Sequence, residues 1–233
     1  MSAFTTVIFD MFNTIAQDGT EHWRETFVEI IEQQKLETTP EALRQAWDNG
    51  ADNFRKQRNT RGAPFISYLD GWADAFAVAF SELDLDGDPL AASQISINNL
   101  ATRPLFPDAP EALSIIGSDY RLAVVSNADD AYLEPVVARI PARFEFVISS
   151  EGAKCYKPDR RLFETAVGRL GVEPSQCVYV GDKQFEDVSG ARGAGMAAVW
   201  INRSRAPLNP DLPMPDGEIQ DLLGLPAVLE RIG

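Results

Sequence analysis

The segment VIFDMFNTIA, residues 7–16, is an apolar run that stops at a carboxylate, Asp10. Its first three residues are of the β-branched and aromatic kinds that favour strands. Two further polar residues, Asn13 and Thr14, follow soon after. Because a charged side chain is seldom buried without a partner, this segment predicts a buried strand whose end carries a functional carboxylate.

Four further apolar runs resemble the first and alternate with helical stretches. The runs are YRLAVVSN at 120–127, FEFVISS at 144–150, CVYVGD at 177–182 and AAVWIN at 197–202. Continuous apolarity is typical of strands that are covered on both faces. Helices are expected at 109–117, 130–139, 159–170 and 186–194. This alternation predicts an α/β fold with a mostly parallel sheet and right-handed crossovers.

The segment from residue 16 to residue 100 has another pattern. Aromatic and aliphatic residues recur there at spacings of three and four, as in Trp23, Phe27 and Ile30 or in Trp72 and Phe76. Each such stripe supplies the apolar face that a bundle helix must bury. The pattern therefore predicts an all-helical domain inserted after the first strand.

The charge of the chain restricts its partners. The chain has 233 residues and a formal net charge of −14, from 35 acidic and 21 basic side chains. Such a field repels nucleic acid and anionic membrane surfaces, so we expect neither as a partner. A small anionic substrate would need a local cationic pocket, whereas a divalent cation would be attracted. Nothing in the sequence decides between a monomer and a homodimer.

The cysteines and the hydropathy indicate the compartment. Two cysteines, Cys155 and Cys177, are too few for a disulfide framework and do not form a paired zinc motif. No signal segment opens the chain, and no apolar stretch approaches the ~20 residues of a membrane helix. We therefore expect a soluble, cytoplasmic protein.

Polar residues follow the ends of four expected strands. In an open parallel sheet, functional groups gather at the carboxyl ends of the strands. Taken alone, each residue is most simply a turn or cap residue, but together they bring carboxylates, hydroxyls, an amide and an ammonium to one edge. The set consists of Asp10 and Thr14, Ser126 and Asn127, Lys157, and Asp182 and Asp187.

Four segments extend this pattern: VIFDMFNT, VVSNADD, KPDRRLF and VYVGDKQFEDVSGARGAGM. In this order they resemble the four motifs of the haloacid dehalogenase (HAD) superfamily, hydrolases that use an aspartate nucleophile. The resemblance covers residues 4–15 and about 104–221, and the helical segment lies where that family has a C1-type cap. It implies a Rossmann-like catalytic core with helices on both faces of the sheet, formed by 1–15 and 101–233, and a cap domain over 16–100.

The resemblance also implies roles for individual residues. Asp10 would be the nucleophile, which forms an acyl-phosphate or an alkyl ester that water then cleaves. Lys157 would pair with Asp10 and with the developing negative charge. Asp182 and Asp187 would join Asp10 in organising Mg²⁺. The main-chain carbonyl of Phe12 would be a further ligand.

The oxygens of the transferred group would be bound by a second set of groups. The resemblance assigns this role to the hydroxyls of Thr14 and Ser126. Backbone N–H groups near Phe12, Asn13 and Asn127 would assist them.

Phe12 departs from the phosphatases of the family. They usually carry a second aspartate at this place, which protonates the leaving group and later activates water. General acid–base catalysis of this kind contributes roughly 10²–10⁴-fold. Phenylalanine cannot supply it, so a phosphatase with Phe12 would be slow unless the leaving group is a good one.

The dehalogenase branch of the family typically has an aromatic residue at the place of Phe12, because a halide leaves without a proton. WINR at 200–203 and the KPDRR run also match that branch. Three residues depart from it: Asp182 and Gln184, where it tends to have serine and asparagine, and Phe163, where it has tyrosine. A carboxylate beside Asp10 would repel it unless a cation lies between them, and phosphoryl transfer needs that metal whereas dehalogenation does not.

The sequence therefore favours a Mg²⁺-dependent phosphatase that acts on a small phosphorylated metabolite. One alternative is a 2-haloacid dehalogenase-type hydrolase. The arginines in NFRKQRNTRG, namely Arg55, Arg58 and Arg61, are its candidates for binding halide or carboxylate, although a solvated basic helix end explains them as well. The other alternative is a catalytically weak member that binds a metabolite or a protein.

Overall fold

The computed structural model describes residues 4–60 and 62–233, which fall into two units. Unit 1 runs up to Gln17 and resumes over Pro104–Asn127 and Val137–Gly233. Unit 2 consists of Asp18–Arg103 and Ala128–Val136.

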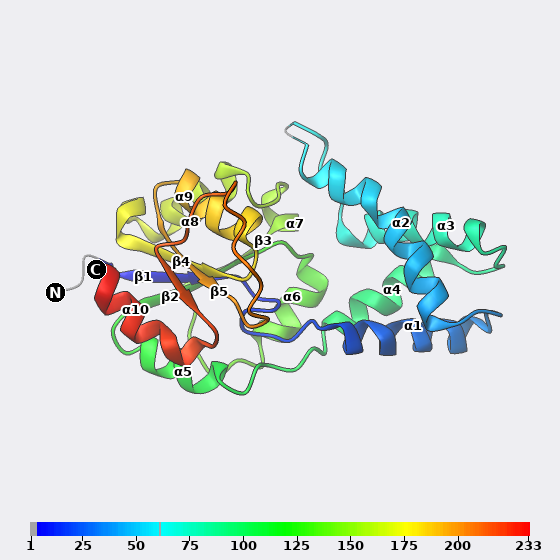
Figure 1. Ribbon diagram of the computed structural model, residues 1–233, viewed down its shortest axis with the longest axis horizontal. Helices are drawn as coiled ribbons and strands as arrows, with labels where there is room; N and C mark the ends of the chain where they lie inside the picture. Colours follow the sequence, from blue (N-terminus) through cyan, green and yellow to red (C-terminus); the bar gives the residue numbers. More distant parts are fainter. Residues whose placement is uncertain (1–3, 61) are drawn as a thin grey trace. The chain divides into compact units, whose positions relative to one another are not determined.

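Unit 1 contains a six-stranded parallel sheet with the strand order β3-β2-β1-β4-β5-β6 (Figure 1). The strands are β1 Thr6–Phe9, β2 Arg121–Ser126, β3 Val147–Ser149, β4 Cys177–Gly181, β5 Ala197–Ile201 and β6 Gly217–Ile219. The order reverses between β1 and β4, which is the switch point where ligands of doubly wound folds bind. The expected Rossmann-like α/β fold is confirmed.

Helices cover both faces of this sheet. In Figure 1, α8 and α9 lie over one face, and α5 and α10 lie over the other. The helices of this unit are α5 Ala109–Ile116, α7 Ser150–Ala153, α8 Arg160–Leu170, α9 Ser189–Gly193 and α10 Leu225–Ile232, with short η1 Pro174–Gln176 and η3 Leu222–Gly224. Both faces of the strands are thereby buried, as their continuous apolarity requires.

The central strand β1 places Asp10. All four residues of β1 are fully buried, and the register aligns Phe9 with Val124 of β2 and Val180 of β4. The Asp10 N–H donates to the Val180 carbonyl at 2.9 Å, which extends the ladder by one step. The ends of three neighbouring strands therefore lie level with Asp10.

Two local features differ from the sequence expectations. The helix expected at 186–194 is a wide π turn, η2 Gln184–Val188, followed by α9. This turn begins two residues after Asp182, and π turns are frequent at functional sites. Strand β6 was not predicted, because three residues are too few to show a period.

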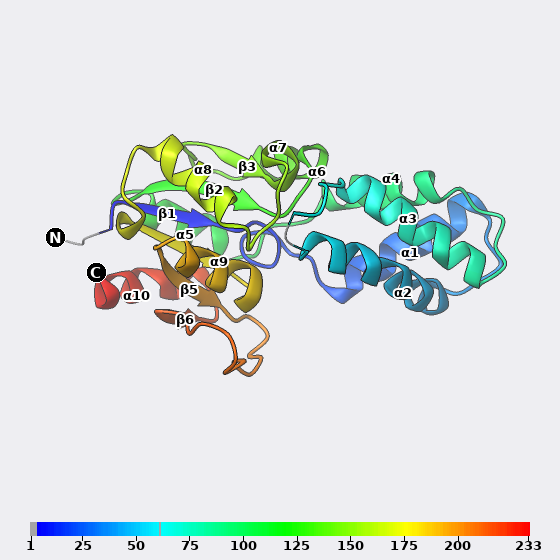
Figure 2. The ribbon, with the colours of Figure 1, turned by 90° about the horizontal axis from the view of Figure 1, so that it is seen from above.

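Unit 2 is helical (Figure 2). Its helices are α1 Thr20–Gln34, α2 Pro40–Arg58, α3 Tyr68–Glu82 and α4 Pro89–Leu100, together with most of α6 Asp130–Val137. Side chains of Thr39, Ser67 and Asp88 cap the N-termini of α2, α3 and α4. The stripes of aromatic residues pack against one another inside this unit, as the sequence pattern predicted. The rings of Trp47 and Trp23, for example, stack with their centres 5.3 Å apart.

The segment 128–136 lies within the stretch 101–233 that the sequence analysis assigned to the core. In the structure it groups with unit 2. The physical reason is that both carboxylate oxygens of Asp129 accept hydrogen bonds from the first turn of α3, from the N–H groups of Tyr68 and Leu69 at 2.9 Å each. The ring of Tyr132 also packs against the ring of Trp72.

In the part of the chain that the structure describes, no helix is both long and apolar enough to cross a bilayer.

Candidate active site

Asp10 is held by two donors through a single oxygen. Its Oδ1 accepts a hydrogen bond from the Ser126 hydroxyl at 2.7 Å and another from Lys157 Nζ at 2.7 Å. Within residues 4–60 and 62–233, no donor is found for Oδ2. The side chain is only 9% exposed, so this oxygen is a fixed, poorly solvated nucleophile candidate.

Lys157 lies at the centre of the site with 1% of its surface exposed. Its ammonium donates to Asp10 Oδ1, to Asp187 Oδ1 at 2.6 Å and to the Tyr179 hydroxyl at 2.9 Å. Burial alone would lower the pKa of Lys157, but the charges of Asp10 and Asp187 raise it well above the usual value. Lys157 is therefore a permanent cation that uses all three of its N–H groups.

Three carboxylates form a cluster beside this cation. Ligand atoms of Asp10, Asp182 and Asp187 lie within 4.8 Å of one another. Burial raises the pKa of Asp182 to about 8 and that of Asp187 to about 6. A divalent cation would favour the ionised form of Asp182 and Asp187, which burial and the neighbouring carboxylates disfavour. The oxygen-only donor set fits Mg²⁺.

The remaining contacts orient this cluster. Asp187 Oδ2 accepts from the Lys183 N–H at 2.8 Å, and the Lys183 ammonium lies 3.4 Å from Asp182 Oδ2. Gly181 makes the approach possible, since a Cβ there would come within 2.3 Å of the Asp187 carboxyl carbon. When all three carboxylates are ionised, they leave one net negative charge against the two ammonium groups, and a divalent cation would convert it into one net positive charge.

The loop after Asp10 presents Thr14. The Met11 carbonyl accepts from the N–H groups of Ile15 and Ala16 at 2.8 and 2.9 Å, and Asn13 adopts a left-handed conformation with φ 58°. The Thr14 hydroxyl is buried and has no hydrogen-bond partner among the described residues. A buried unpaired hydroxyl is costly, so it is well suited to bind an oxygen of a ligand.

Arg203 contacts the main chain of this loop. Its Nη2 donates to the Thr14 carbonyl at 2.7 Å, and its guanidinium pairs with both oxygens of Asp108 at 3.0 and 2.9 Å. The same guanidinium lies 3.7 Å from the centre of the Phe106 ring. Arg203, the last residue of the WINR segment, thus stabilises the loop that carries Thr14.

The side chain of Asn127 pairs with the main chain of Lys157. Its Oδ1 accepts from the Lys157 N–H at 2.7 Å, and its Nδ2 donates to the Lys157 carbonyl at 3.2 Å and to Glu186 at 3.0 Å. The amide therefore fixes the segment that carries the lysine. Its side chain is engaged in holding Lys157, while the role expected for its backbone N–H remains a prediction.

The structure brings five of the expected site residues into one cluster: Asp10, Ser126, Lys157, Asp182 and Asp187. Phe12 and Asn13 lie on the same loop as Thr14, and Phe12 is half-buried. Sequence reasoning missed Tyr179. The available signal was a lone polar group within a fully buried strand, because a buried tyrosine hydroxyl needs a partner.

Of the arginines proposed for halide or carboxylate, Arg55 and Arg58 lie in unit 2. Arg55 pairs with Asp48 at 2.8 Å and with Asp52 at 2.5 Å. Arg58 lies over the rings of Phe54 and Tyr68 and donates to the Tyr68 hydroxyl. Arg61 is outside the described residues.

Comparison with known proteins shows the family of the chain. A family model for haloacid dehalogenase-like hydrolases matches residues 4–195. Phosphoserine phosphatase from Thermus thermophilus is 33% identical over 68% of this chain and 67% of its own length. (S)-2-haloacid dehalogenase from Pseudomonas sp. (strain YL) is 27% identical over 71% of this chain and 72% of its own.

Solved structures share the fold over nearly the whole chain. The HAD-hydrolase YfnB from Bacillus subtilis, bound to magnesium, superposes with a TM-score of 0.80 at 19% identity and covers 97% of this chain and 98% of its own. L-2-haloacid dehalogenase from Xanthobacter autotrophicus gives a TM-score of 0.78 at 20% identity, with 99% and 100% covered.

The raised pKa values predict how the metal-free protein responds to pH. Asp182 and Asp187 ionise near pH 4 when unfolded but only near pH 8 and pH 6 when folded. A raised carboxyl pKa means that the folded state binds more protons, so the free energy of unfolding falls as pH rises through this window. In EDTA, the melting temperature should fall from about pH 5 to about pH 8.

Asp182→Asn should flatten this fall, since it removes the group with the largest shift, whereas Asp119→Asn, at an exposed position, should not. Added Mg²⁺ should restore stability at high pH in the wild type, because a ligand of the folded state stabilises it. Equal slopes in the wild type and in Asp182→Asn would contradict the account.

Proposed function

The chain belongs to the haloacid dehalogenase-like hydrolase family, and on that basis we propose that it is a Mg²⁺-dependent phosphatase of a small, anionic, phosphorylated metabolite. The family makes it a hydrolase. The phosphatase assignment is supported by the site and by the similarity to a phosphoserine phosphatase, and it names no individual substrate.

The carboxylate of Asp182 is the observation that carries the proposal. It adds a third, half-buried carboxylate within 4.8 Å of the ligand atoms of Asp10 and Asp187. Lys157 already pairs with the other two carboxylates, and the one ion pair found for Asp182 among the described residues is with Lys183 at 3.4 Å. A site with such a charge excess suits a divalent cation, and with that cation it would attract a phosphate dianion.

The reaction follows from the hydrogen bonds at Asp10. Ser126 and Lys157 fix Oδ1, so Oδ2 is free to attack phosphorus. A bond forms between Oδ2 and phosphorus while the bond to the leaving-group oxygen breaks, and that oxygen takes the electron pair. Water then attacks phosphorus in the acyl-phosphate, loses a proton, and releases phosphate and the Asp10 carboxylate.

Neighbouring groups stabilise the charge of this transfer. The charge of the Lys157 ammonium, 2.7 Å from Asp10 Oδ1, would stabilise the developing negative charge. The Thr14 hydroxyl, which has no partner among the described residues, is available to a phosphoryl oxygen. Mg²⁺, which Asp10, Asp182 and Asp187 would hold, would supply Lewis-acid polarisation of the phosphoryl group.

Phe12 favours a second candidate, a 2-haloacid dehalogenase-type hydrolase. A halide leaves without protonation, so such an enzyme would not need an acid at this place. The similarity to (S)-2-haloacid dehalogenase from Pseudomonas sp. is in line with it. The described arginines of the cap do not add support, because Arg55 is already paired with Asp48 and Asp52.

The two candidates are separated by one paired assay. p-Nitrophenyl phosphate and L-2-chloropropionate are each incubated with Mg²⁺ and with excess EDTA, and Asp10→Asn serves as the blank. We expect phosphate release that is lost with EDTA and lost in Asp10→Asn, since both the metal and the nucleophile are needed. Chloride release that EDTA does not affect would replace the proposal with the dehalogenase.

A substitution at Phe12 tests why this site would be a slow phosphatase. Phe12→Asp should raise kcat/KM for an alkyl phosphate such as glycerol phosphate on the order of 10²-fold, the contribution of general acid catalysis. The gain with p-nitrophenyl phosphate should be much smaller. An alkoxide is a far stronger base than a phenoxide and almost as strong as hydroxide, whereas even an unsubstituted phenol has a pKa of about 10.

Phe12→Asn is the matched control, because asparagine has nearly the same size and polarity as aspartate but has no carboxyl proton to donate. Equal gains in Phe12→Asp and Phe12→Asn would show that space or hydration at residue 12, and not proton transfer, limits the reaction.

A further inference from the structure

Tyr179 lies behind the site and has no part in the chemistry described above. We propose that Tyr179 is a positioning residue that ties the two hydrogen-bond donors of Asp10 to each other, so that Asp10 Oδ1 is fixed and Oδ2 is aimed at phosphorus. The expected effect on phosphatase turnover rests on the proposed function. The expected effect on the Lys157 ammonium does not.

The hydrogen bonds of Tyr179 have only one possible direction. Lys157 Nζ lies 2.9 Å from the Tyr179 hydroxyl, and an ammonium can only donate. The hydroxyl must therefore accept from Lys157 and donate its own proton to the Val125 carbonyl, at 2.6 Å. This proton is not available for exchange with a substrate.

The two partners of Tyr179 are the two supports of Asp10. Lys157 donates directly to Asp10 Oδ1, and Val125 is followed in the chain by Ser126, which donates to the same oxygen. The phenol thus closes a ring of contacts through Lys157, Asp10, Ser126 and Val125. A shift of either donor is resisted through the other.

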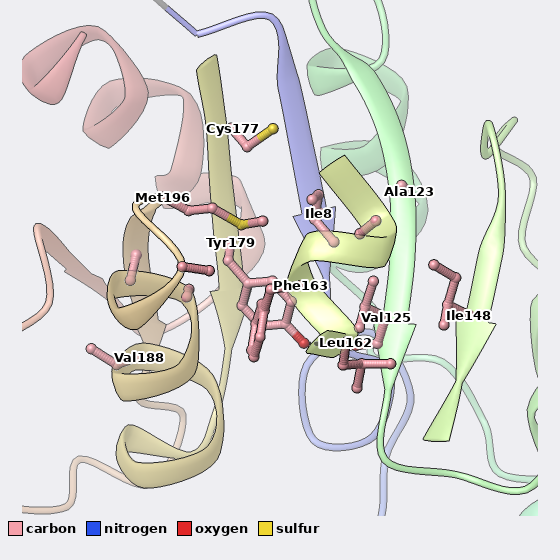
Figure 3. Close-up of a cluster of buried hydrophobic side chains, with 14 of the residues drawn as sticks. Ile8, Ala123, Val125, Ile148, Leu162, Phe163, Cys177, Tyr179, Val188 and Met196 are labelled. Atoms are coloured by element: carbon pink, nitrogen blue, oxygen red, sulfur yellow. Dashed lines mark hydrogen bonds between the residues drawn. The ribbon is translucent and has the colours of Figure 1, made fainter. Parts of the chain in front are cut away.

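The ring of Tyr179 is itself held rigidly. It is 1% exposed and projects from β4 at the position aligned with Ile8 of β1. The Phe163 ring of α8 meets it edge to face at 5.2 Å, and Figure 3 shows the two rings together with the Tyr179 oxygen directed toward Val125. Gly190 permits this packing, since a Cβ there would clash with the Phe163 ring at 2.4 Å.

Lys157 needs this third acceptor. Its ammonium is fully buried, and Asp10 and Asp187 account for only two of its three protons. Without the Tyr179 hydroxyl, one N–H of a buried cation would lack a partner, and the ammonium would be free to turn between the two carboxylates. Burial also raises the pKa of the Tyr179 phenol well above its usual value, so it remains a neutral hydroxyl in this position.

The first test observes the ammonium itself and needs no activity. The chain has five lysines, at 35, 56, 154, 157 and 183. Proton–nitrogen NMR of lysine ammonium groups detects those whose protons exchange slowly with water, and arginine at the other four positions assigns the signal of Lys157. Tyr179→Phe, which keeps the ring, should accelerate the exchange of this signal at least about 10-fold, the effect of losing one hydrogen bond to a charged group.

The matched control is Tyr132→Phe, which removes a hydroxyl from another buried tyrosine, in unit 2. It should leave the Lys157 signal unchanged. An unchanged signal in Tyr179→Phe, or the same acceleration in Tyr132→Phe, would overturn the proposal.

The second test separates positioning from a general loss of stability. With p-nitrophenyl phosphate and Mg²⁺, Tyr179→Phe should lower kcat roughly 10- to 100-fold, as expected for about one hydrogen bond to a charged group. KM and the inhibition constant of inorganic phosphate should stay within about twofold, because ground-state binding is not the step affected. An unchanged kcat, or a parallel loss in Tyr132→Phe, would overturn the proposal. Absence of phosphatase activity in the wild type would refute the proposed function, while the NMR result would still decide the role of Tyr179.

Discussion

A buried ammonium between buried carboxylates is the interaction on which this site depends. Lys157 contacts Asp10 at 2.7 Å and Asp187 at 2.6 Å with almost no solvent exposure. Removing one partner of such a buried pair typically costs about 3–5 kcal/mol, since the other charge is left uncompensated. Other groups of unit 1 hold this cation in place. The Asn127 side chain is hydrogen-bonded to the main chain of Lys157, and the Tyr179 hydroxyl accepts the third hydrogen bond of the ammonium. The aligned ends of β1, β2 and β4 bring the acceptors within reach.

The sequence predicted the elements of this arrangement better than their connections. Continuous apolar runs gave five of the six strands, and the strand ends gave Asp10, Ser126, Lys157, Asp182 and Asp187, because parallel strands deliver their ends to one edge. Contacts between distant segments carry no such signal. The Asp129 carboxylate that attaches 128–136 to unit 2 and the Tyr179 hydroxyl that joins Lys157 to Val125 depend on register and packing, which no local pattern encodes.

Asp182 and Phe12 point to different chemistries within one site. Asp182 completes a carboxylate cluster, and burial disfavours the ionisation of Asp182 unless a cation is bound, which suits phosphoryl transfer. Because residue 12 is phenylalanine, the loop after Asp10 offers no acid at this place to protonate the leaving group. This suits a leaving group that departs as a stable anion. Both features are met by a metal-dependent enzyme whose substrate has a good leaving group, and the family contains both phosphatases and 2-haloacid dehalogenases among the relatives of this chain.

The central claim is that Asp10 attacks phosphorus, and the state of its carboxylate after turnover tests it most directly. The protein is mixed with p-nitrophenyl phosphate and Mg²⁺ in ¹⁸O water, quenched in acid and analysed by mass spectrometry of the peptide that contains Asp10. The account predicts a phosphoryl group on Asp10 with no ¹⁸O in its carboxylate, because water attacks phosphorus. An Asp10 that carries ¹⁸O and never a phosphoryl group would contradict it, since water would then have attacked the carboxyl carbon of an ester.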